Sequence, residues 1–494
     1  MYSVRTTKTA SRATAVQIIQ YEQRRKIILK HIGSAHTPEE LTSLKRTACD
    51  WIEKETGQPR LFPERTPQPH GLIPLSKCQY LGFRYTFIYE IITDIFRLIR
   101  LDGAEPLLRD LALIRIVEPA SKLESLKLLT EYFGKTYHRT DLYRRIPTFV
   151  SRKGSIERNM IAFAQTHFSF DFSLVFYDVT TLYFESFQED TFKTTGFSKD
   201  NKSNQPQVVI GLIVTKEGFP VSYEVFEGNT FEGKTFIPTI VGFKDTHSVT
   251  NLTVVADAAM ISLDNIERLK EHDLSYIVGA RVANLTRTQM KTVSEVLGAT
   301  DGKTYRMETE RGLLVCDFSL ARYQKDKREM DKQIAKAEKL IKEKQALKRT
   351  KFVKSKRKAT QVLHTELIEK TTLLLGIKGY YTNLTDSPDA TIIDQYHALW
   401  HIEQAFRIAK SDLAMRPIYH FKKQTIEAHI LICFMALAVC KYMELKTGRS
   451  TKKLIKLFKS VTDARLKNLL TSEEIILRSQ VTEELRGLVK SLRY

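Results

Sequence analysis

A change in hydrophobic period after Phe170 is the feature that most constrains the fold of this sequence. From Phe83 to Phe170, apolar residues recur at spacings of three and four, which is typical of amphipathic helices. After Phe170, short segments rich in β-branched and aromatic residues indicate strands. In order along the chain these segments are SLVFYDVTTLYF, QVVIGLIVT, FPVSYEVFEG, a helix near 236–243, LTVVADAAM, a helix at 262–271, and SYIVGAR. The predicted order is therefore β-β-β-α-β-α-β.

A strongly basic insertion interrupts this order between residues 281 and 391. Residues 321–360 carry 16 Lys or Arg against 5 Asp or Glu, and much of the stretch from 325 to 349 has a helical pattern. One interpretation is a solvated helical face. The other is an arm lying along DNA phosphates, where each neutralised phosphate releases counterions. The predicted contacts of such an arm are Lys348, Arg349, Lys351 and Lys354.

The domain organisation follows from these changes of pattern, and we expect a mixed α/β protein of several domains. The helical segment before the strands carries basic pairs, which fits a DNA-binding domain or, equally, a helical bundle with a basic solvated face. The expected segments are an N-terminal region and linker at 1–80, the helical DNA-binding domain at 81–170, the first part of the core at 171–281, the insertion at 282–372, the second part of the core at 373–445, and a helical C-terminal tail at 446–494.

The overall charge predicts a polyanionic partner. The chain has 77 Lys plus Arg against 57 Asp plus Glu, a formal net charge of +20, which favours nucleic acid first and an anionic membrane surface second. The most apolar run, 430–440, is shorter than the roughly 20 residues that span a bilayer and indicates a buried helix. The N-terminal residues contain no apolar stretch of signal-peptide type, so we expect a cytoplasmic protein without a membrane partner.

The five cysteines are scattered and form no C-x-x-C pair of the kind that holds zinc. We expect free thiols, mostly buried. Any metal ion must then be held by oxygen ligands, which favours Mg²⁺ or Mn²⁺ over Zn²⁺.

Three carboxylates stand where metal-dependent chemistry would need them. Asp178 directly follows the apolar run SLVFY, and Asp257 directly follows LTVVA. Glu403 lies in the helical segment YHALWHIEQAFRIAK, where spacings of four and seven place Tyr396, Arg407 and Lys410 on its face. Two strand-end aspartates and a helical glutamate can hold two divalent cations about 3.5–4 Å apart, a clamp suited to phosphoryl transfer.

Each of these residues also has an ordinary interpretation. A single aspartate at a strand end is more often a turn or cap residue, and a helical glutamate flanked by Arg and Lys is usually part of a surface ion pair. Other acidic residues compete for the same role. These are Glu224, Glu227, Glu232 and Asp412, none of which combines a buried strand end with the chain order of the three.

The arrangement resembles the ribonuclease H-like core of DDE transposases and retroviral integrases. The helix is similar to the Y-x2-R-x3-E-x6-K signature of one large group of bacterial insertion-sequence transposases, matched by Tyr396, Glu403 and Lys410, with Leu399 at the Arg position. The segments YDVTTLYFES, GFSKDNKSNQPQVVIGLIV, VVADAAM and LWHIEQAFRIAKSDLAMRPIYH extend this resemblance over about 107–437. It includes the long insertion between the second Asp and the Glu.

The resemblance implies a function. A transposase of this group binds the terminal inverted repeats of its element, nicks DNA at the element ends and joins the freed 3′-hydroxyl to target DNA. Asp178, Asp257 and Glu403 would bind two Mg²⁺ or Mn²⁺ ions, and Tyr396, Arg407 and Lys410 would hold DNA near the scissile phosphate. A homodimer would pair the two ends. Two alternatives stay open: a metal-dependent nuclease without strand transfer, and a catalytically silent DNA-binding protein descended from a transposase.

Overall fold

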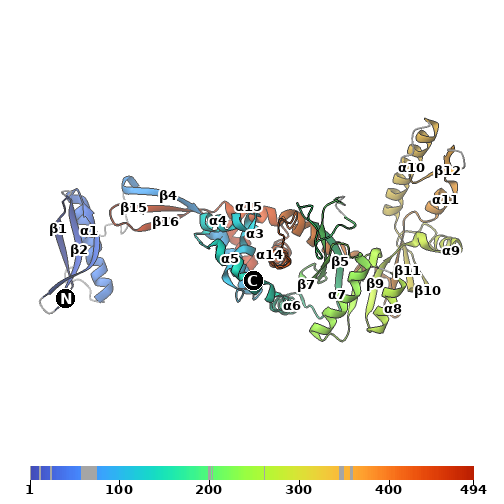
Figure 1. Ribbon diagram of the computed structural model, residues 1–494, viewed down its shortest axis with the longest axis horizontal. Helices are drawn as coiled ribbons and strands as arrows, with labels where there is room; N and C mark the ends of the chain where they lie inside the picture. Colours follow the sequence, from blue (N-terminus) through green and yellow to red (C-terminus); the bar gives the residue numbers. More distant parts are fainter. Residues whose placement is uncertain are drawn as a thin grey trace. The chain divides into compact units, whose positions relative to one another are not determined.

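The structure is a computed structural model. It describes residues 2–10, 13–22, 25–56, 75–198, 202, 204–260, 262–343, 350–356 and 360–493. It is a mixed α/β protein (Figure 1). The chain divides into two compact units. The first unit comprises Met1–Ile91, Lys127–Thr136 and Leu454–Lys490, and the second comprises Ile92–Leu126, Tyr137–Lys453 and Ser491–Tyr494. The six predicted segments follow other boundaries and remain a prediction.

A small N-terminal domain lies in the first unit. Its antiparallel strands β1 (Tyr2–Lys8), β2 (Thr14–Glu22) and β3 (Arg25–Ala35) are covered by helix α1 (Pro38–Thr56). Thr37 caps the helix, because its hydroxyl accepts from the Glu40 amide while the Glu40 carboxylate accepts from the Thr37 amide. The core is formed by Val16, Ile18, Ile32, Ala35, Leu44 and Ala48. Residues 57–74, the predicted linker, lie outside the described residues.

A second sheet of the first unit corrects the expected helical tail. Strands β15 (Asp463–Asn468) and β16 (Glu474–Arg478) form a hairpin, and β15 also pairs with β4 (Cys78–Arg84). In the described part of this tail, the helices after the end of α14 are α15 (Thr451–Lys459) and α16 (Glu483–Arg493). The sequence pattern missed the hairpin because its strands are short and because β4, which pairs with it, is almost 400 residues away in the chain.

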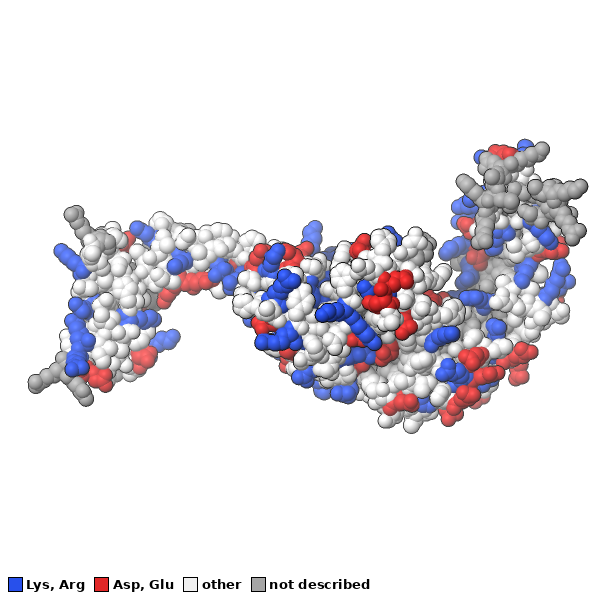
Figure 2. All heavy atoms as spheres, viewed as in Figure 1, with Lys and Arg blue, Asp and Glu red and all other residues white. Residues whose placement is uncertain are grey.

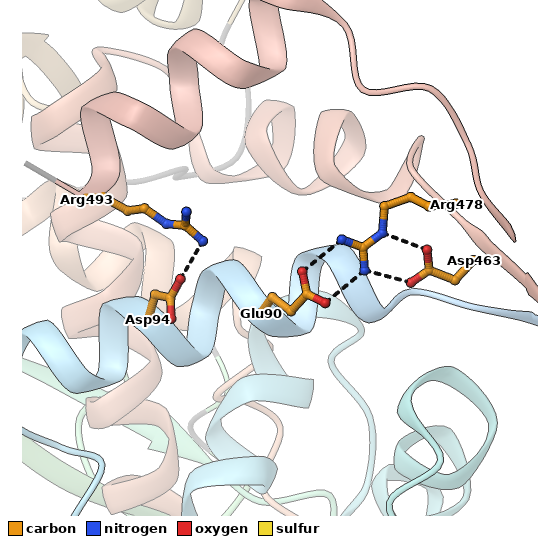
Figure 3. A network of polar contacts seen from close by, with 5 residues as sticks. All are labelled: Glu90, Asp94, Asp463, Arg478 and Arg493. Atoms are coloured by element: carbon orange, nitrogen blue, oxygen red, sulfur yellow. Dashed lines mark hydrogen bonds and ion pairs between the residues drawn. The ribbon is translucent and has the colours of Figure 1, made fainter. Parts of the chain in front are cut away.

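Buried charge in the first unit is compensated by one arginine (Figure 3). The guanidinium of Arg478 donates to both carboxylate oxygens of Asp463, at 2.7 and 3.0 Å, and to both oxygens of Glu90, at 3.0 and 2.8 Å. Asp463 is 2% exposed, so this bidentate contact replaces the water that the carboxylate loses on burial.

The helical pattern before Phe170 is confirmed. It comprises α2 (Thr86–Leu98), α3 (Pro106–Val117), α4 (Lys122–Phe133), α5 (Arg139–Ser151) and α6 (Lys153–Phe168). In the second unit α3, α5 and α6 pack around α14 (Lys423–Thr447), the expected apolar helix. Helix α14 is long and apolar enough to cross a membrane by length and composition alone, and 94% of its most apolar window is buried inside the protein.

The centre of the second unit is an eight-stranded sheet with the order β10-β11-β14-β9-β8-β5-β6-β7. Neighbours β5, β8 and β9 run parallel, and the other pairs are antiparallel. The predicted order β-β-β-α-β-α-β is confirmed. It corresponds to β5 (Leu174–Tyr183), β6 (Gln207–Val214), β7 (Pro220–Glu227), α7 (Glu232–His247), β8 (Thr253–Ala256), α8 (Leu263–Glu271) and β9 (Ser275–Ala280).

The insertion is partly built into this sheet. After α9 (Arg287–Leu297), strands β10 (Thr304–Thr309) and β11 (Gly312–Phe318) extend the sheet, and β14 (Ile377–Thr382) inserts between β11 and β9. The predicted basic helix is α10 (Leu320–Lys342), which packs with β12 (Val353–Lys356), β13 (Thr360–Leu363) and α11 (Thr365–Leu373) around its own small core. That core contains Met330, Ala337, Phe352 and Leu375.

Candidate active site

The parallel pairing of β5 with β8 brings the two predicted aspartates to neighbouring positions. Tyr177 on β5 is the register partner of Ala256 on β8, so Asp178 lies beside Asp257, the first residue after β8. Asp178 itself is inside β5, which continues to Tyr183, and not at a strand end as the sequence predicted. The carboxyl ends of parallel strands form the usual ligand-binding edge of an open α/β sheet. Asp257 is exposed at this edge and Asp178 is half-buried.

The two faces of the sheet separate structural from candidate catalytic side chains. Tyr177 points to the face covered by α7, where its hydroxyl lies 2.7 Å from the hydroxyl of Thr235. Side chains alternate along a strand, so Asp178 points to the other face. There β5 contacts helix α13 (Trp400–Arg407), which carries Glu403.

The predicted helical segment YHALWHIEQAFRIAK is not one continuous helix, which corrects one expectation. Helix α12 (Asp389–His397) ends before α13 begins, and a π turn follows over Ile408–Asp412. Spacings of four and seven therefore do not place the signature residues on one continuous face. Tyr396 is buried on α12, Glu403 and Arg407 are exposed on α13, and Lys410 is half-buried in the π turn.

Ion pairs distinguish Glu403 from two of the other acidic residues considered as metal ligands, Glu224 and Asp412. Glu224 is paired with Lys153 at 2.6 Å, and Asp412 with Lys452 at 3.0 Å. Glu403, in contrast, has no hydrogen-bond or ion-pair partner among the described residues, although Arg407 is one helical turn away. The surface ion pair that usually explains such a glutamate is therefore not formed here.

Tyr396 connects the helices to the second aspartate. Its hydroxyl donates to the Asp257 carboxylate at 3.4 Å, and its ring packs on Tyr380 of β14 with the ring centroids 4.8 Å apart. Burial, together with the negative charge of Asp257, raises the pKa of Tyr396. Gly279 of β9 makes room for this contact, since a Cβ there would collide with the Tyr396 hydroxyl.

One basic residue that the sequence did not single out, Lys378, also lies at this site. The ammonium of Lys378, at the start of β14, lies 4.5 Å from the Tyr396 ring centroid. Its pKa is lowered by burial and by Arg322 of α10, against the opposing charges of Asp317, Asp257 and Glu403. The only signal in the sequence was a lysine inside the apolar strand IKGYYT.

The donor chemistry fits a hard divalent cation. Asp178, Asp257 and Glu403 offer carboxylate oxygens, the ligands that Mg²⁺ and Mn²⁺ prefer. Within the described part of the chain, no three acidic, His or Cys side chains lie close enough to share one ion. Mg²⁺ usually keeps several waters and needs only one or two carboxylates besides phosphate oxygens, and the carboxylates of Asp257 and Glu403 are both exposed.

The predicted basic contacts of the insertion are only partly described. Lys348 and Arg349 lie outside the described residues. The ammonium of Lys351 lies 5.3 Å from the Phe352 ring centroid, and that of Lys354 lies 3.9 Å from the Glu366 carboxylate, with both side chains of this pair largely exposed. The face drawn in Figure 2 carries basic side chains both on the N-terminal domain and in the insertion.

All five cysteines are free thiols and three of them are buried, which confirms the expectation from the sequence.

Comparisons with known proteins place the chain in a family. No curated protein matches it. Among solved structures, it is similar to a piggyBac transposase synaptic complex with hairpin DNA (9% identity, 90% of this chain and 81% of that chain, TM-score 0.35) and to a Mos1 transposase paired-end complex (12% identity, 47% and 66%, TM-score 0.16). Both similarities are too distant to explain details of this chain. The family model described as "Transposase DDE domain", however, matches residues 169–439, more than half of the sequence. This protein therefore belongs to the DDE transposase family.

Proposed function

We propose that this protein is an active transposase with a ribonuclease H-like core. It binds the terminal inverted repeats of its insertion sequence, cleaves DNA at the element ends and joins the 3′-hydroxyl ends to target DNA. One observation carries the proposal: the parallel pairing of β5 and β8, which sets Asp178 beside Asp257 at the carboxyl end of β8. The family match and the net charge of +20 support it.

The residues divide the work as follows. Asp178, Asp257 and Glu403 would hold two Mg²⁺ or Mn²⁺ ions, which when bound activate the attacking oxygen and stabilise the leaving oxygen. Tyr396 was predicted from the sequence to contact DNA. Because it is buried and its hydroxyl donates to the Asp257 carboxylate, it would hold that carboxylate in place instead. Arg407, exposed one turn beyond Glu403, and Lys410 in the π turn would bind DNA phosphates beside the scissile bond.

The partners and compartment follow from this function. Two copies of the chain would pair the two transposon ends as a homodimer on DNA. The insertion, with the predicted contacts Lys348, Arg349, Lys351 and Lys354, would add backbone contacts without reading bases. The protein would act in the cytoplasm, on chromosomal DNA.

A strand-transfer assay with precleaved ends tests the proposal against its two alternatives. The protein is mixed with a duplex from the element's own terminus that already carries a free 3′-hydroxyl, together with a supercoiled target and Mg²⁺. A transposase joins the end to the target. A nuclease cuts uncleaved ends but leaves the precleaved end unjoined, and a silent DNA-binding protein shifts both duplexes in a gel and changes neither. Either of these results would reject the proposal.

A further inference from the structure

Lys378 occupies the same edge and the same face of the sheet as the candidate catalytic acids. Strand β14 is antiparallel to β9, with Gly379 opposite Ala280 at the end of β9. Lys378 therefore lies at the carboxyl edge of the parallel strands, where Asp257 follows β8. Tyr380 packs on Tyr396, and residues two apart on a strand share a face, so Lys378 also faces α12.

The ammonium of Lys378 has ring contacts but no anionic partner. Its Nζ lies 4.5 Å from the ring centroid of Tyr396 and 5.6 Å from that of Tyr380. Among the described residues nothing accepts a hydrogen bond from it, and no carboxylate lies within ion-pair distance. The negative charges of Asp257 and Glu403 act on the Lys378 ammonium electrostatically, without a direct contact.

A half-buried ammonium in this state is well placed to bind an anion. Burial removes water from the ammonium, which costs free energy, and contact with aromatic faces recovers only part of that cost. Its three N–H donors remain available. A phosphodiester passing along the acidic edge would supply the charge-assisted acceptors that the protein does not.

The neighbouring helix leaves this position without a cation. Leu399, which stands at the Arg position of the helical signature, is an apolar residue only 6% exposed. The basic residues of that region, Arg407 and Lys410, both follow Glu403 in the chain. On the Tyr396 side of the acids, Lys378 on β14 is the residue whose ammonium lies against the tyrosine ring.

We propose that Lys378 is a further catalytic residue, which binds a non-bridging oxygen of the phosphodiester being cut. This inference rests on the proposed function, because it concerns the same reaction. The phosphate contact that a basic residue at position 399 could have made from the helix would then be made by Lys378 from strand β14.

The test compares Lys378→Met, Lys378→Gln and Lys378→Arg with the wild type in single-turnover nicking of end DNA. Loss of the charge should slow nicking about 100-fold, while the Kd for the uncut duplex at 0.15 M salt rises less than about fivefold. Arginine should restore most of the rate. Lys270→Met, which removes an exposed lysine of α8, is the matched control and should nick like the wild type.

The outcomes separate the inference from the proposed function. If Lys378→Met and Lys378→Gln nick like the wild type, the inference is wrong and the proposed function stands. If Lys378→Met melts at a lower temperature than the wild type, the nicking rates of Lys378→Gln and Lys378→Arg are compared instead. Equally slow nicking by these two variants would also reject a phosphate contact. If the wild type and Lys270→Met leave end DNA uncut, the proposed function fails and the inference falls with it.

Discussion

At the scale of single residues, the contact between Tyr396 and Asp257 requires a glycine at position 279, where no side chain blocks the Tyr396 hydroxyl. Strand β9 carries a glycine at position 279, and any Cβ there would meet the Tyr396 hydroxyl. The ring is held on its other side by Tyr380. Tyr396 therefore has little freedom to move aside without losing the Asp257 carboxylate.

We predict that Gly279→Ala displaces the Tyr396 hydroxyl and disturbs the site more than the fold. Unfolding free energy should fall by about 1–3 kcal/mol from overpacking, and single-turnover nicking should fall about tenfold or more, a loss of at least 1.4 kcal/mol in transition-state stabilisation. Gly242→Ala on α7 is the control, since nothing lies within 4 Å of a Cβ there. Equal nicking by both variants would show that the Tyr396 contact has no part in catalysis.

A second residue-scale feature is a buried basic cluster in the second unit. The ammonium of Lys122 lies 2.6 Å from Nε2 of His420 and donates to the carbonyl of Thr425. Burial, with a smaller contribution from Arg115, lowers the pKa of Lys122 to about 7, and burial and Lys122 lower that of His420 to about 3. The groups facing Lys122 are Arg115, His420, His429 and Cys433.

This cluster should make stability depend on pH. Between about pH 7 and the ordinary lysine value of 10.5, the unfolded chain binds a proton at Lys122 that the folded chain does not, so stability rises with pH. Lys122→Met should remove that rise, on the order of 1 kcal/mol per pH unit, and should stabilise the protein at pH 6. Thermal melting of both proteins from pH 6 to 10 measures it. Parallel curves would contradict the assignment.

At the scale of elements, the sequence predicted those whose pattern is local. Apolar runs ending in Asp178 and Asp257 predicted β5 and β8, and the order of strands and helices from 171 to 281 is confirmed. The break between α12 and α13 was not predictable, because Ala398 and Leu399 are good helix formers and give no local signal for it. Lys378 was missed for a related reason: a sequence does not say which face of β14 meets α12.

For the insertion, we predict that Lys351 and Lys354 contact the DNA backbone. Lys351 and Lys354 follow α10 and keep their charges exposed or only weakly paired. Replacing both with Gln should weaken binding about equally to end DNA and to unrelated duplex, and should reduce the slope of log affinity against log salt by up to about 2. Affinities at four salt concentrations, with Lys270→Gln as the control, measure the slope. An unchanged slope would leave the insertion as a solvated face.

At the scale of the whole molecule, the chain forms two compact units. In the first, Arg478 is the bidentate partner of the buried Asp463 (Figure 3). Arg478→Met would leave that carboxylate without its cation. Breaking a fully buried ion pair lowers the free energy of unfolding by about 3–5 kcal/mol. Because Arg478 is about one third exposed, we expect a smaller loss here, about 2–4 kcal/mol.

Amide hydrogen exchange reports this loss where it occurs. In Arg478→Met the amides of β15 should exchange about 30- to 1,000-fold faster than in the wild type. The matched control is Arg486→Met, which breaks an exposed pair with Glu483 and should change exchange by less than about threefold. Equal protection of β15 in all three proteins would show that Asp463 is stabilised by other contacts.

The central claim is the proposal that Asp178, Asp257 and Glu403 are the catalytic acids of this DDE transposase. Its most direct test is single-turnover nicking of end DNA in Mg²⁺ by Asp178→Asn, Asp257→Asn and Glu403→Gln, with affinity for the same duplex measured in parallel. We predict that each variant loses nicking while its Kd stays within about threefold of wild type, because most affinity comes from phosphate contacts elsewhere. Nicking at the wild-type rate by any one of the three variants would remove that residue from the site and contradict the account.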